Sequence, residues 1–495
     1  MDEWAEITRA LEEMAASGNA EVHEDGEWLA ELAGLHCEVR RAGKHPLVHL
    51  WSDEKNLTRR LLAIKESSAD RIILEVQRFG RPKPGRLEFR RTDSPRTFGR
   101  VSREQFRARL RRMLAEQFPD SSIDSMTAAP DLQHSFSGLY VRGRMHEGTH
   151  EWAFLAVSSA ESAAAVDGIL AFGILWLDWV RSHASRRAIE GLRLFVPQGT
   201  SLSHRERSLA LGAAARTEIF EICEPGGQME TVEHADAGNL ESWLAPRREI
   251  ESMLAAAAES VVRTRSIIPA AGHAIDLRVE REPGDVAICF RGLEFARWNA
   301  GQMFFGLGDS QERLSGATQP SFERLIRNID RHRNSVAEDT NHPLYRSAPE
   351  RWLEAVILED PARLDATLDP MQLYSQVPAL AGRDRGILDL LGVTRQGRLV
   401  VIELKASEDI QMPVQAADYW LRVRRLQRAG DFERCGYFSG KELDPRPPLV
   451  WLVAPGLRFH SATDILLKYL SSEIQITRIG VNENWRGGLR IIFRQ

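Results

Sequence analysis

The 495-residue chain contains little cysteine and few lysines. Its four cysteines, Cys37, Cys223, Cys289 and Cys435, are widely scattered, and no Cys-x-x-Cys pair occurs. This spacing predicts buried free thiols in a reducing cytoplasm, with no disulfide framework and no structural zinc site. Lysine occupies only seven positions against 58 arginines, so Lys405 is an unusual choice in this chain.

Long uncharged apolar runs are also missing, since no stretch reaches the length of about 18 residues that a membrane span needs. The first residues, MDEWAEITRALEEM, are acidic and amphipathic, unlike a signal peptide. We therefore expect a cytoplasmic protein without a membrane. The net charge of −5 gives no overall attraction to nucleic acid, so binding to it would need local basic surface.

The length excludes a single hydrophobic core, and the 43% hydrophobic content is typical of soluble globular proteins. Alternating helical and strand-like segments predict a multi-domain α+β chain. Residues 1–98 read as a small α+β N-terminal domain. Residues 236–345 read as a helical connector followed by a small β segment.

The most informative stretch of the chain begins near residue 386. Reading residues 398–405 as a strand puts Glu403 and Lys405 on one face, among buried Val and Ile. Residues 386–394 read as a second strand. Between the two lies a three-residue hairpin loop in which Gly397 supplies the left-handed position.

The register of this hairpin brings two acids together. If Thr394 pairs with Arg398, Asp389 lies directly opposite Glu403, with Cβ atoms roughly 4.5 to 5.5 Å apart. Two carboxylates that close repel each other unless a cation lies between them. Mg²⁺ suits such a site because it takes oxygen ligands from one or two carboxylates plus phosphate, and Lys405 would orient water or neutralise phosphate charge.

A helix is predicted after this strand. Pro413 fits its first turn, and Gly430 ends it near residue 429. Gln415 and Tyr419 are four residues apart and therefore share a face. A basic cluster that includes Arg422 and Arg425 continues the helix and is either a solvated face or a phosphate contact.

Together with the preceding PERWLEAVILEDP, this succession resembles the PD-(D/E)XK nuclease superfamily, most closely the NucS/EndoMS type and RecB-like nuclease domains. The resemblance covers roughly residues 346–480 and predicts that residues 346–495 form a restriction-endonuclease-like mixed sheet flanked by helices. The matching residues are Asp389, the Glu403-Leu404-Lys405 triplet and the Gln415-x-x-x-Tyr419 motif.

The resemblance implies a Mg²⁺- or Mn²⁺-dependent deoxyribonuclease that hydrolyses phosphodiesters in DNA repair, restriction or defence. The implied catalytic residues are Asp389, Glu403, Lys405, Gln415 and an acid of the first helix, for which Glu350 and Glu354 both qualify. The implied metal ligands are Asp389, Glu403 and Glu350, and the implied DNA contacts are Tyr419, Arg422 and Arg425. The alternative is a non-catalytic DNA-binding or scaffold protein with a nuclease-like fold.

The same succession of helices and strands recurs upstream, within residues 99–235. Aligning Gly148 with Gly397 places Tyr140, Phe154 and Ala156 at the positions of the three catalytic residues. This predicts a nuclease-like domain that lacks catalytic residues, a degenerate second copy. Because NucS-type enzymes are dimers, the chain would form a homodimer or an intrachain pseudo-dimer.

Residues 146–150, His-Glu-Gly-Thr-His, match the H-E-x-x-H pattern of zinc proteases. That chemistry requires both histidines on one face of a helix. Here the motif lies between two strand-like runs, and Gly148 favours a turn. We therefore predict a hairpin tip.

Overall fold

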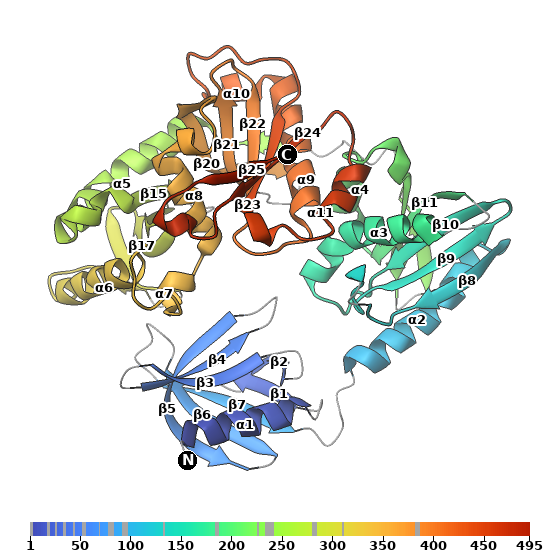
Figure 1. Cartoon of the computed structure of the whole chain (residues 1–495), viewed down its shortest axis with the longest axis horizontal. Helices are drawn as coiled ribbons and strands as arrows, with labels where there is room; N and C mark the ends of the chain where they lie inside the picture. The colour runs from blue at the N-terminus through green and yellow to red at the C-terminus, as the bar shows by residue number, and fades with distance from the viewer. Residues whose placement is uncertain are drawn as a thin grey trace.

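The computed structural model shows an α+β chain of several domains, which confirms the predicted fold class (Figure 1). It describes residues 3–16, 20–24, 27–32, 36–42, 45–51, 56–68, 70–77, 84–91, 98–131, 134–183, 188–224, 227–232, 242–279, 285–308, 311–381 and 387–495. The strands in these ranges form four sheets. The four cysteines are free, with Cys289 buried and the others half-buried.

The N-terminal domain is an antiparallel sheet of seven strands, ordered β2-β1-β7-β6-β5-β4-β3, with the helix α1 against it. Its hydrophobic core joins one apolar face of α1 to alternate residues of the strands. The elements are α1 (Glu3–Ala16), β1 (Ala20–Glu24), β2 (Glu27–Glu31), β3 (His36–Ala42), β4 (His45–Trp51), β5 (Asn56–Ser67), β6 (Arg71–Gln77) and β7 (Gly85–Arg91).

The middle domain, residues 98–232, has six strands in the order β13-β12-β11-β10-β9-β8. Its three central strands, β10 to β12, are parallel and the outer pairs are antiparallel. The elements are α2 (Phe98–Gln117), β8 (Ser121–Thr127), β9 (Val141–Glu147), β10 (His150–Ala156), α3 (Ala163–His183), β11 (Ile189–Pro197), α4 (Ser201–Ser208), β12 (Thr217–Cys223) and β13 (Gln228–Thr231).

The connector contains a long helix and a small antiparallel sheet. Its elements are α5 (Arg247–Ile267), β15 (Ile275–Val279), β16 (Asp285–Phe290), β17 (Leu293–Asn299), β18 (Gln302–Phe305), β19 (Glu312–Arg313), α6 (Gln319–His332) and α7 (Pro343–Arg346). One short strand departs from the predicted boundary. Because β14 (Ser242–Leu244) hydrogen-bonds to β20, it belongs to the C-terminal sheet instead.

The C-terminal domain, residues 349–495, has the sheet order β14-β20-β21-β22-β23-β24-β25. Its elements are α8 (Pro349–Glu359), β20 (Leu368–Ala381), β21 (Ile387–Thr394), β22 (Leu399–Leu404), α9 (Met412–Ala429), α10 (Asp431–Arg434), β23 (Leu449–Pro455), α11 (Thr463–Tyr469), β24 (Gln475–Val481) and β25 (Ile491–Arg494). Short 3₁₀ helices lie at Ala213–Ala215, Pro269–Ala274, Pro361–Arg363, Gly456–Arg458 and Trp485–Gly487.

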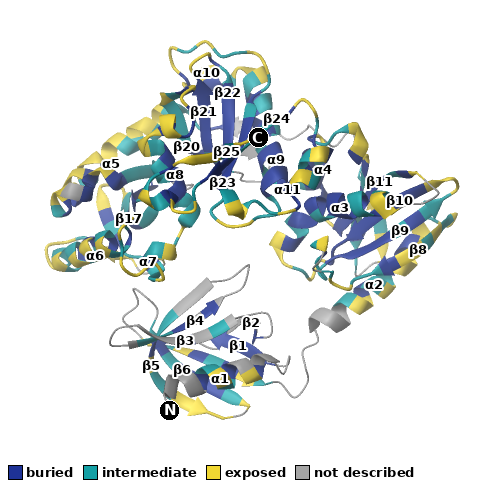
Figure 2. Ribbon diagram, viewed as in Figure 1, coloured by how far each residue is buried: buried dark blue, intermediate teal, exposed yellow. Residues whose placement is uncertain are grey.

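Strand β22 is buried along its whole length because helices cover both faces of the sheet (Figure 2). Leu399 and Val401 join the hydrophobic core beneath α9. Val400 and Ile402 join the opposite core, which includes Trp352 of α8. This alternation confirms the strand and both of its faces as read from the sequence.

The predicted repeat is present in the topology. Strands β8 to β13 and β20 to β25 follow the same order, with the same sequence of two antiparallel, two parallel and one antiparallel pairing. Helix α3 connects β10 to β11 as α9 connects β22 to β23, and α4 corresponds in the same way to α11. The chain therefore contains the same six-stranded arrangement twice.

The position-by-position alignment of the two copies is wrong, because their hairpin turns differ in length. In the β9/β10 turn, two residues (148 and 149) separate the paired Glu147 and His150. In the β21/β22 turn, three residues (395–397) separate the paired Thr394 and Arg398. Aligning the two glycines therefore shifts the register. Phe154, which was aligned with Glu403, packs on the α2 face with Phe106, away from α3.

Counting strand pairs from each turn gives the corrected correspondence. Arg142 and Leu155 pair five steps from the β9/β10 turn. In the C-terminal domain the last pair is Leu390 with Ile402, four steps from the β21/β22 turn, so Asp389 and Glu403 occupy the fifth step when this register is continued. Two residues further on, Val157 takes the position of Lys405. Arg142, Leu155 and Val157 of the middle domain therefore correspond to Asp389, Glu403 and Lys405. The predicted correspondence of Tyr140, Phe154 and Ala156 with these three residues was wrong.

Helix α3 is long and apolar enough to cross a membrane by length and composition, with a mean hydropathy of 1.6, although 61% of that segment is buried. No other helix in the described part of the chain meets this test. The apolar character of α3 has a structural cause. The α3 core includes strand residues of its own sheet and also Val414 of α9 and Leu466 of α11, so the helix is covered on two sides.

Candidate active site

The β21/β22 hairpin has the geometry predicted from its turn. The Thr394 N–H donates to the Arg398 carbonyl at 2.8 Å, and Gly397 has a φ of +87°. A Cβ at Gly397 would lie 2.2 Å from the carbonyl oxygen of Glu442, so both the backbone angle and the space require glycine. The turn therefore fixes which strand residues face each other.

Asp389 and Glu403 are held close together in a buried environment. The Leu404 N–H donates to Asp389 Oδ2 at 3.0 Å, which ties the aspartate to the end of β22. The Glu403 side chain is 4% exposed. Burial raises the pKa of Glu403 above its usual range, and the negative charge of Asp389 raises it further. Burial likewise raises the pKa of Asp389.

Lys405 lies beside this pair. Its Nζ is 3.2 Å from Glu403 Oε1 and 3.1 Å from Asp409 Oδ2. Burial alone would lower the pKa of Lys405, but the negative charges of Glu403 and Asp409 raise it above its usual range. The ammonium therefore stays protonated at neutral pH, so its available roles are charge neutralisation and proton donation rather than proton abstraction.

Both candidate acids of α8 lie near the site. Glu350 is half-buried, and its Oε1 accepts a hydrogen bond of 3.2 Å from the Ala406 N–H at the end of β22. Glu354 is buried, and burial raises its pKa to about 7. Its Oε2 accepts hydrogen bonds from Arg351 at 3.0 Å and from Gln376 at 2.8 Å.

Sequence reasoning missed three residues that the fold brings to this cluster. Arg351 lies 3.8 Å from Asp389 Oδ1 and bridges it to Glu354. Gln376 reaches the cluster from β20, where its φ of +51° is unusual for a residue other than glycine. Asp409 is four residues after Lys405, and this spacing was the one available signal.

Tyr419 of the α9 motif lies near the acids, and Gln415 is one turn before it on the same helix. Gln415 Oε1 is buried and accepts no hydrogen bond from any described residue. Burial, together with the negative charges of Glu403 and Asp389, raises the pKa of the Tyr419 hydroxyl. Pro413 begins the helix as predicted, and Gly430, with a φ of +71°, ends it.

Arg422 and Arg425, predicted as DNA contacts, lie in the interface with the middle domain. The Arg422 side chain is 4% exposed and forms an ion pair of 2.7 Å with Asp418, which also meets Arg207 at 3.4 Å. Arg425 forms an ion pair with Glu206 of α4. The sequence could not distinguish these uses, since a basic helix face suits phosphate and carboxylate equally.

The acid pair suits a divalent cation because it has an oxygen without a hydrogen-bond donor and two neighbouring negative charges. Glu403 Oε2 is buried and has no hydrogen-bond donor within the described ranges, while the neighbouring Asp389 adds like charge. Among the residues that the structure describes, no group of three or more His, Cys, Asp or Glu side chains is arranged as a metal site. The candidate ligands are therefore a pair, as in Mg²⁺ sites completed by water and substrate phosphate.

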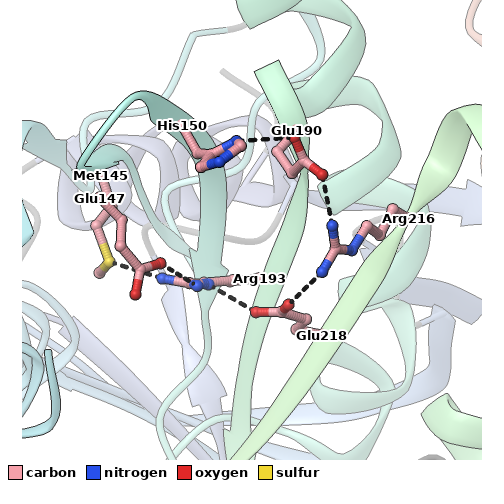
Figure 3. A network of polar contacts seen from close by, with 7 residues as sticks. All are labelled: Met145, Glu147, His150, Glu190, Arg193, Arg216 and Glu218. Atoms are coloured by element: carbon pink, nitrogen blue, oxygen red, sulfur yellow. Dashed lines mark hydrogen bonds and ion pairs between the residues drawn. The ribbon is translucent and has the colours of Figure 1, made fainter. Parts of the chain in front are cut away.

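The H-E-x-x-H motif is a hairpin tip, as predicted (Figure 3). Glu147 and His150 flank the turn between β9 and β10. Arg193 donates to Glu147 at 2.6 Å and to Glu218 at 2.9 Å, and His150 lies 3.2 Å from Glu190. These residues form an ion-pair network across four strands, which stabilises that end of the sheet.

No model of a known protein family matches the chain, and no curated protein shows significant similarity to it.

Proposed function

We propose that this chain is a cytoplasmic, Mg²⁺- or Mn²⁺-dependent deoxyribonuclease of the PD-(D/E)XK type, acting in DNA repair, restriction or defence. The observation that carries the proposal is the pair formed by buried Glu403 and half-buried Asp389, with Lys405 beside it. Each of these side chains comes from the position that the family motif assigns. The supporting fold is a mixed sheet in which two strands bearing these residues are covered by helices on both faces.

Asp389 and Glu403 would hold the metal, which when bound polarises the phosphodiester and makes water a better nucleophile. Of the two acids of α8, Glu350 would be the one to join this pair as a ligand once the metal is bound. Its carboxylate lies beside the end of β22, whereas Glu354 already accepts hydrogen bonds from Arg351 and Gln376. Glu354 and Arg351 would position Asp389 rather than contact the metal.

Lys405 would stabilise the negative charge that develops on the phosphate, because its ammonium remains protonated. Gln415 would orient a polar group in the site through its unsatisfied Oε1. Tyr419, whose hydroxyl keeps its proton, would donate a hydrogen bond there and contact the DNA. Hydrolysis would leave one phosphate end and one hydroxyl end.

The test uses the purified full-length chain with single-stranded, linear duplex and circular DNA, in Mg²⁺, Mn²⁺ or EDTA. Cleavage is expected with either ion and not in EDTA, and Glu403→Gln and Lys405→Met should each reduce it by at least about 100-fold. Lys441→Met is the matched control, because Lys441 pairs with Asp369 at 2.8 Å in the same domain.

Failure of the wild-type chain to cleave any of these substrates would refute the proposal. Equal cleavage by wild type and both site variants would do so too, since the activity would then belong to a contaminant. DNA binding that EDTA does not alter, without cleavage, would favour the non-catalytic DNA-binding or scaffold alternative.

A further inference from the structure

The middle domain has a pocket of about 450 Å³ on the α3 side of its sheet, within the range of small-molecule sites. Strands β8 and β9, the second half of α3 and the loop after β8 enclose it. In the C-terminal copy the corresponding side is filled. There Tyr374, Tyr437 and Phe438 pack beneath α9, the last two from the segment that follows α10.

Aromatic rings form one wall of the pocket. Trp176 and Trp179, one turn apart on α3, stack with ring centroids 4.9 Å apart and an interplanar angle of 11°. His183 continues the stack at 4.3 Å from Trp179, and Phe136 meets both indoles edge-on. The Trp179 ring is half-buried and His183 is exposed, so the stack ends at the pocket opening.

Hydrogen-bond donors without acceptors also line the pocket. Arg142 is 6% exposed, and its Nη2 donates to the Ala129 carbonyl at 2.7 Å. Its Nε and Nη1, like Nε1 of Trp179, are buried and donate to no residue in the described part of the chain. The guanidinium lies 4.9 Å from the Phe136 ring, which offsets part of its desolvation.

Arg142 is also the residue that occupies the position of Asp389. The inactive copy therefore has a buried cation where the other copy has a metal-binding carboxylate. Burial lowers the pKa of Arg142, and the negative charge of Asp131, another pocket residue, opposes this. Buried donors left unsatisfied are costly, so a ligand that brings acceptor oxygens would relieve that cost.

We propose that this pocket binds one unpaired, carbonyl-bearing nucleobase of a DNA strand, which displaces the exposed His183 ring and stacks on Trp179 with an oxygen accepting from Arg142. Asp131 would accept from a base N–H. A flat ring with both acceptors and donors on its edge matches this combination of aromatic wall, orphaned donors and one carboxylate. The choice of DNA rests on the proposed nuclease function, which the pocket would serve by holding the substrate strand.

The experiment measures binding of a fluorescein-labelled octathymidylate to the full-length chain in EDTA by fluorescence anisotropy. Trp179→Ala should weaken binding by at least about fivefold, the lower end of one base–aromatic stack. Trp179→Phe, which keeps a smaller aromatic ring, should bind with an affinity between those of wild type and Trp179→Ala. His183→Ala, at an exposed side chain, removes the ring that the base must displace and should bind at least as tightly as wild type.

A blunt duplex of the same length should bind wild type and Trp179→Ala equally, since its bases are paired. Equal affinity of wild type and all three variants for the single strand, or no affinity of the folded wild type, would overturn the inference. Glu403→Gln separates the two proposals. Binding through Trp179 should survive this substitution, so absence of cleavage with intact Trp179-dependent binding rejects only the nuclease function.

Discussion

Leu211 and Leu470 form an isolated antiparallel bridge between the middle and C-terminal domains. Two backbone hydrogen bonds of 2.9 and 2.8 Å flank it. Leu211 follows α4 and Leu470 follows α11, the corresponding helix of the other copy. The bridge therefore joins the same position of both copies, as in the isologous contact of a two-fold dimer, but within one chain.

The helices around this bridge pack reciprocally. Helix α4 of the middle domain contacts α9 of the C-terminal domain, and α11 of the C-terminal domain contacts α3 (Figure 1). The shorter helix of each copy therefore packs against the longer helix of the other copy. This arrangement explains why α3 is apolar on two sides. A homodimer of the whole chain stays a prediction. The surfaces that the middle and C-terminal domains bury against each other are not available to form that homodimer.

The interface ion pairs should matter unequally for stability. Asp418→Ala should destabilise the chain by about 3 to 5 kcal/mol, because it removes the carboxylate that forms a buried ion pair with Arg422 and also meets Arg207, which keeps its pair with Asp167. Lys468→Ala, which breaks an exposed pair with Asp178, should cost about 0 to 1 kcal/mol. Urea unfolding of both variants measures the difference, and equal losses would contradict it.

His204 should make the chain sensitive to acid. It is buried in α4 with no hydrogen-bond partner among the described residues, and burial, together with Arg207, lowers its pKa to about 3. Because the pKa of His204 in the folded chain lies below the unfolded value of about 6.5, the contribution of neutral His204 to the free energy of unfolding is complete above pH 6.5. That contribution is lost as pH falls from 6.5 toward 3, at about 1.4 kcal/mol per unit.

Thermal unfolding between pH 7 and pH 4 tests this prediction. His204→Leu should flatten the acid side of the stability curve relative to wild type. His273→Asn, at an exposed histidine, is the matched control and should leave the curve unchanged. An unchanged slope in His204→Leu would show that other groups cause the loss.

Gly397→Ala should disturb the hairpin that sets the acid pair. The added Cβ would meet the Glu442 carbonyl at 2.2 Å, in addition to the strain of a φ of +87°. Gly430→Ala has a similar φ of +71° but nothing within 4 Å, so it isolates the backbone strain, about 1 to 3 kcal/mol. Denaturant unfolding should show the larger loss in Gly397→Ala, and equal losses would argue against the steric contact.

Glu403→Gln should stabilise the chain in EDTA, because it removes a buried negative charge that lies beside the negative charge of Asp389. Mn²⁺ at about 100 times its Kd should add about 2.7 kcal/mol to the wild type and little to the variant. Melting temperatures with and without Mn²⁺ measure both effects. Asp360→Asn, at an exposed carboxylate outside the site, is the control. An equal rise in melting temperature with Mn²⁺ in wild type and Glu403→Gln would contradict the proposal that Glu403 is a metal ligand.

Local chemistry allowed the sequence to predict much of the candidate site. Alternation in β22 assigns Glu403 and Lys405 to one face, and the turn at Gly397 sets their register with Asp389. Pro413 and Gly430 mark the ends of α9. Each of these predictions depends on residues within about 30 positions of one another, where periodicity and turn preference are decisive.

The tertiary structure alone decided what distant residues do. Arg351 and Gln376 reach the acids from α8 and β20, and Arg425 pairs with Glu206, a carboxylate of another domain. The two-residue turn at Gly148 also moved Arg142, instead of Tyr140, to the position of Asp389. A one-residue change in register reverses which face a side chain occupies, and packing between domains sets which surfaces are covered.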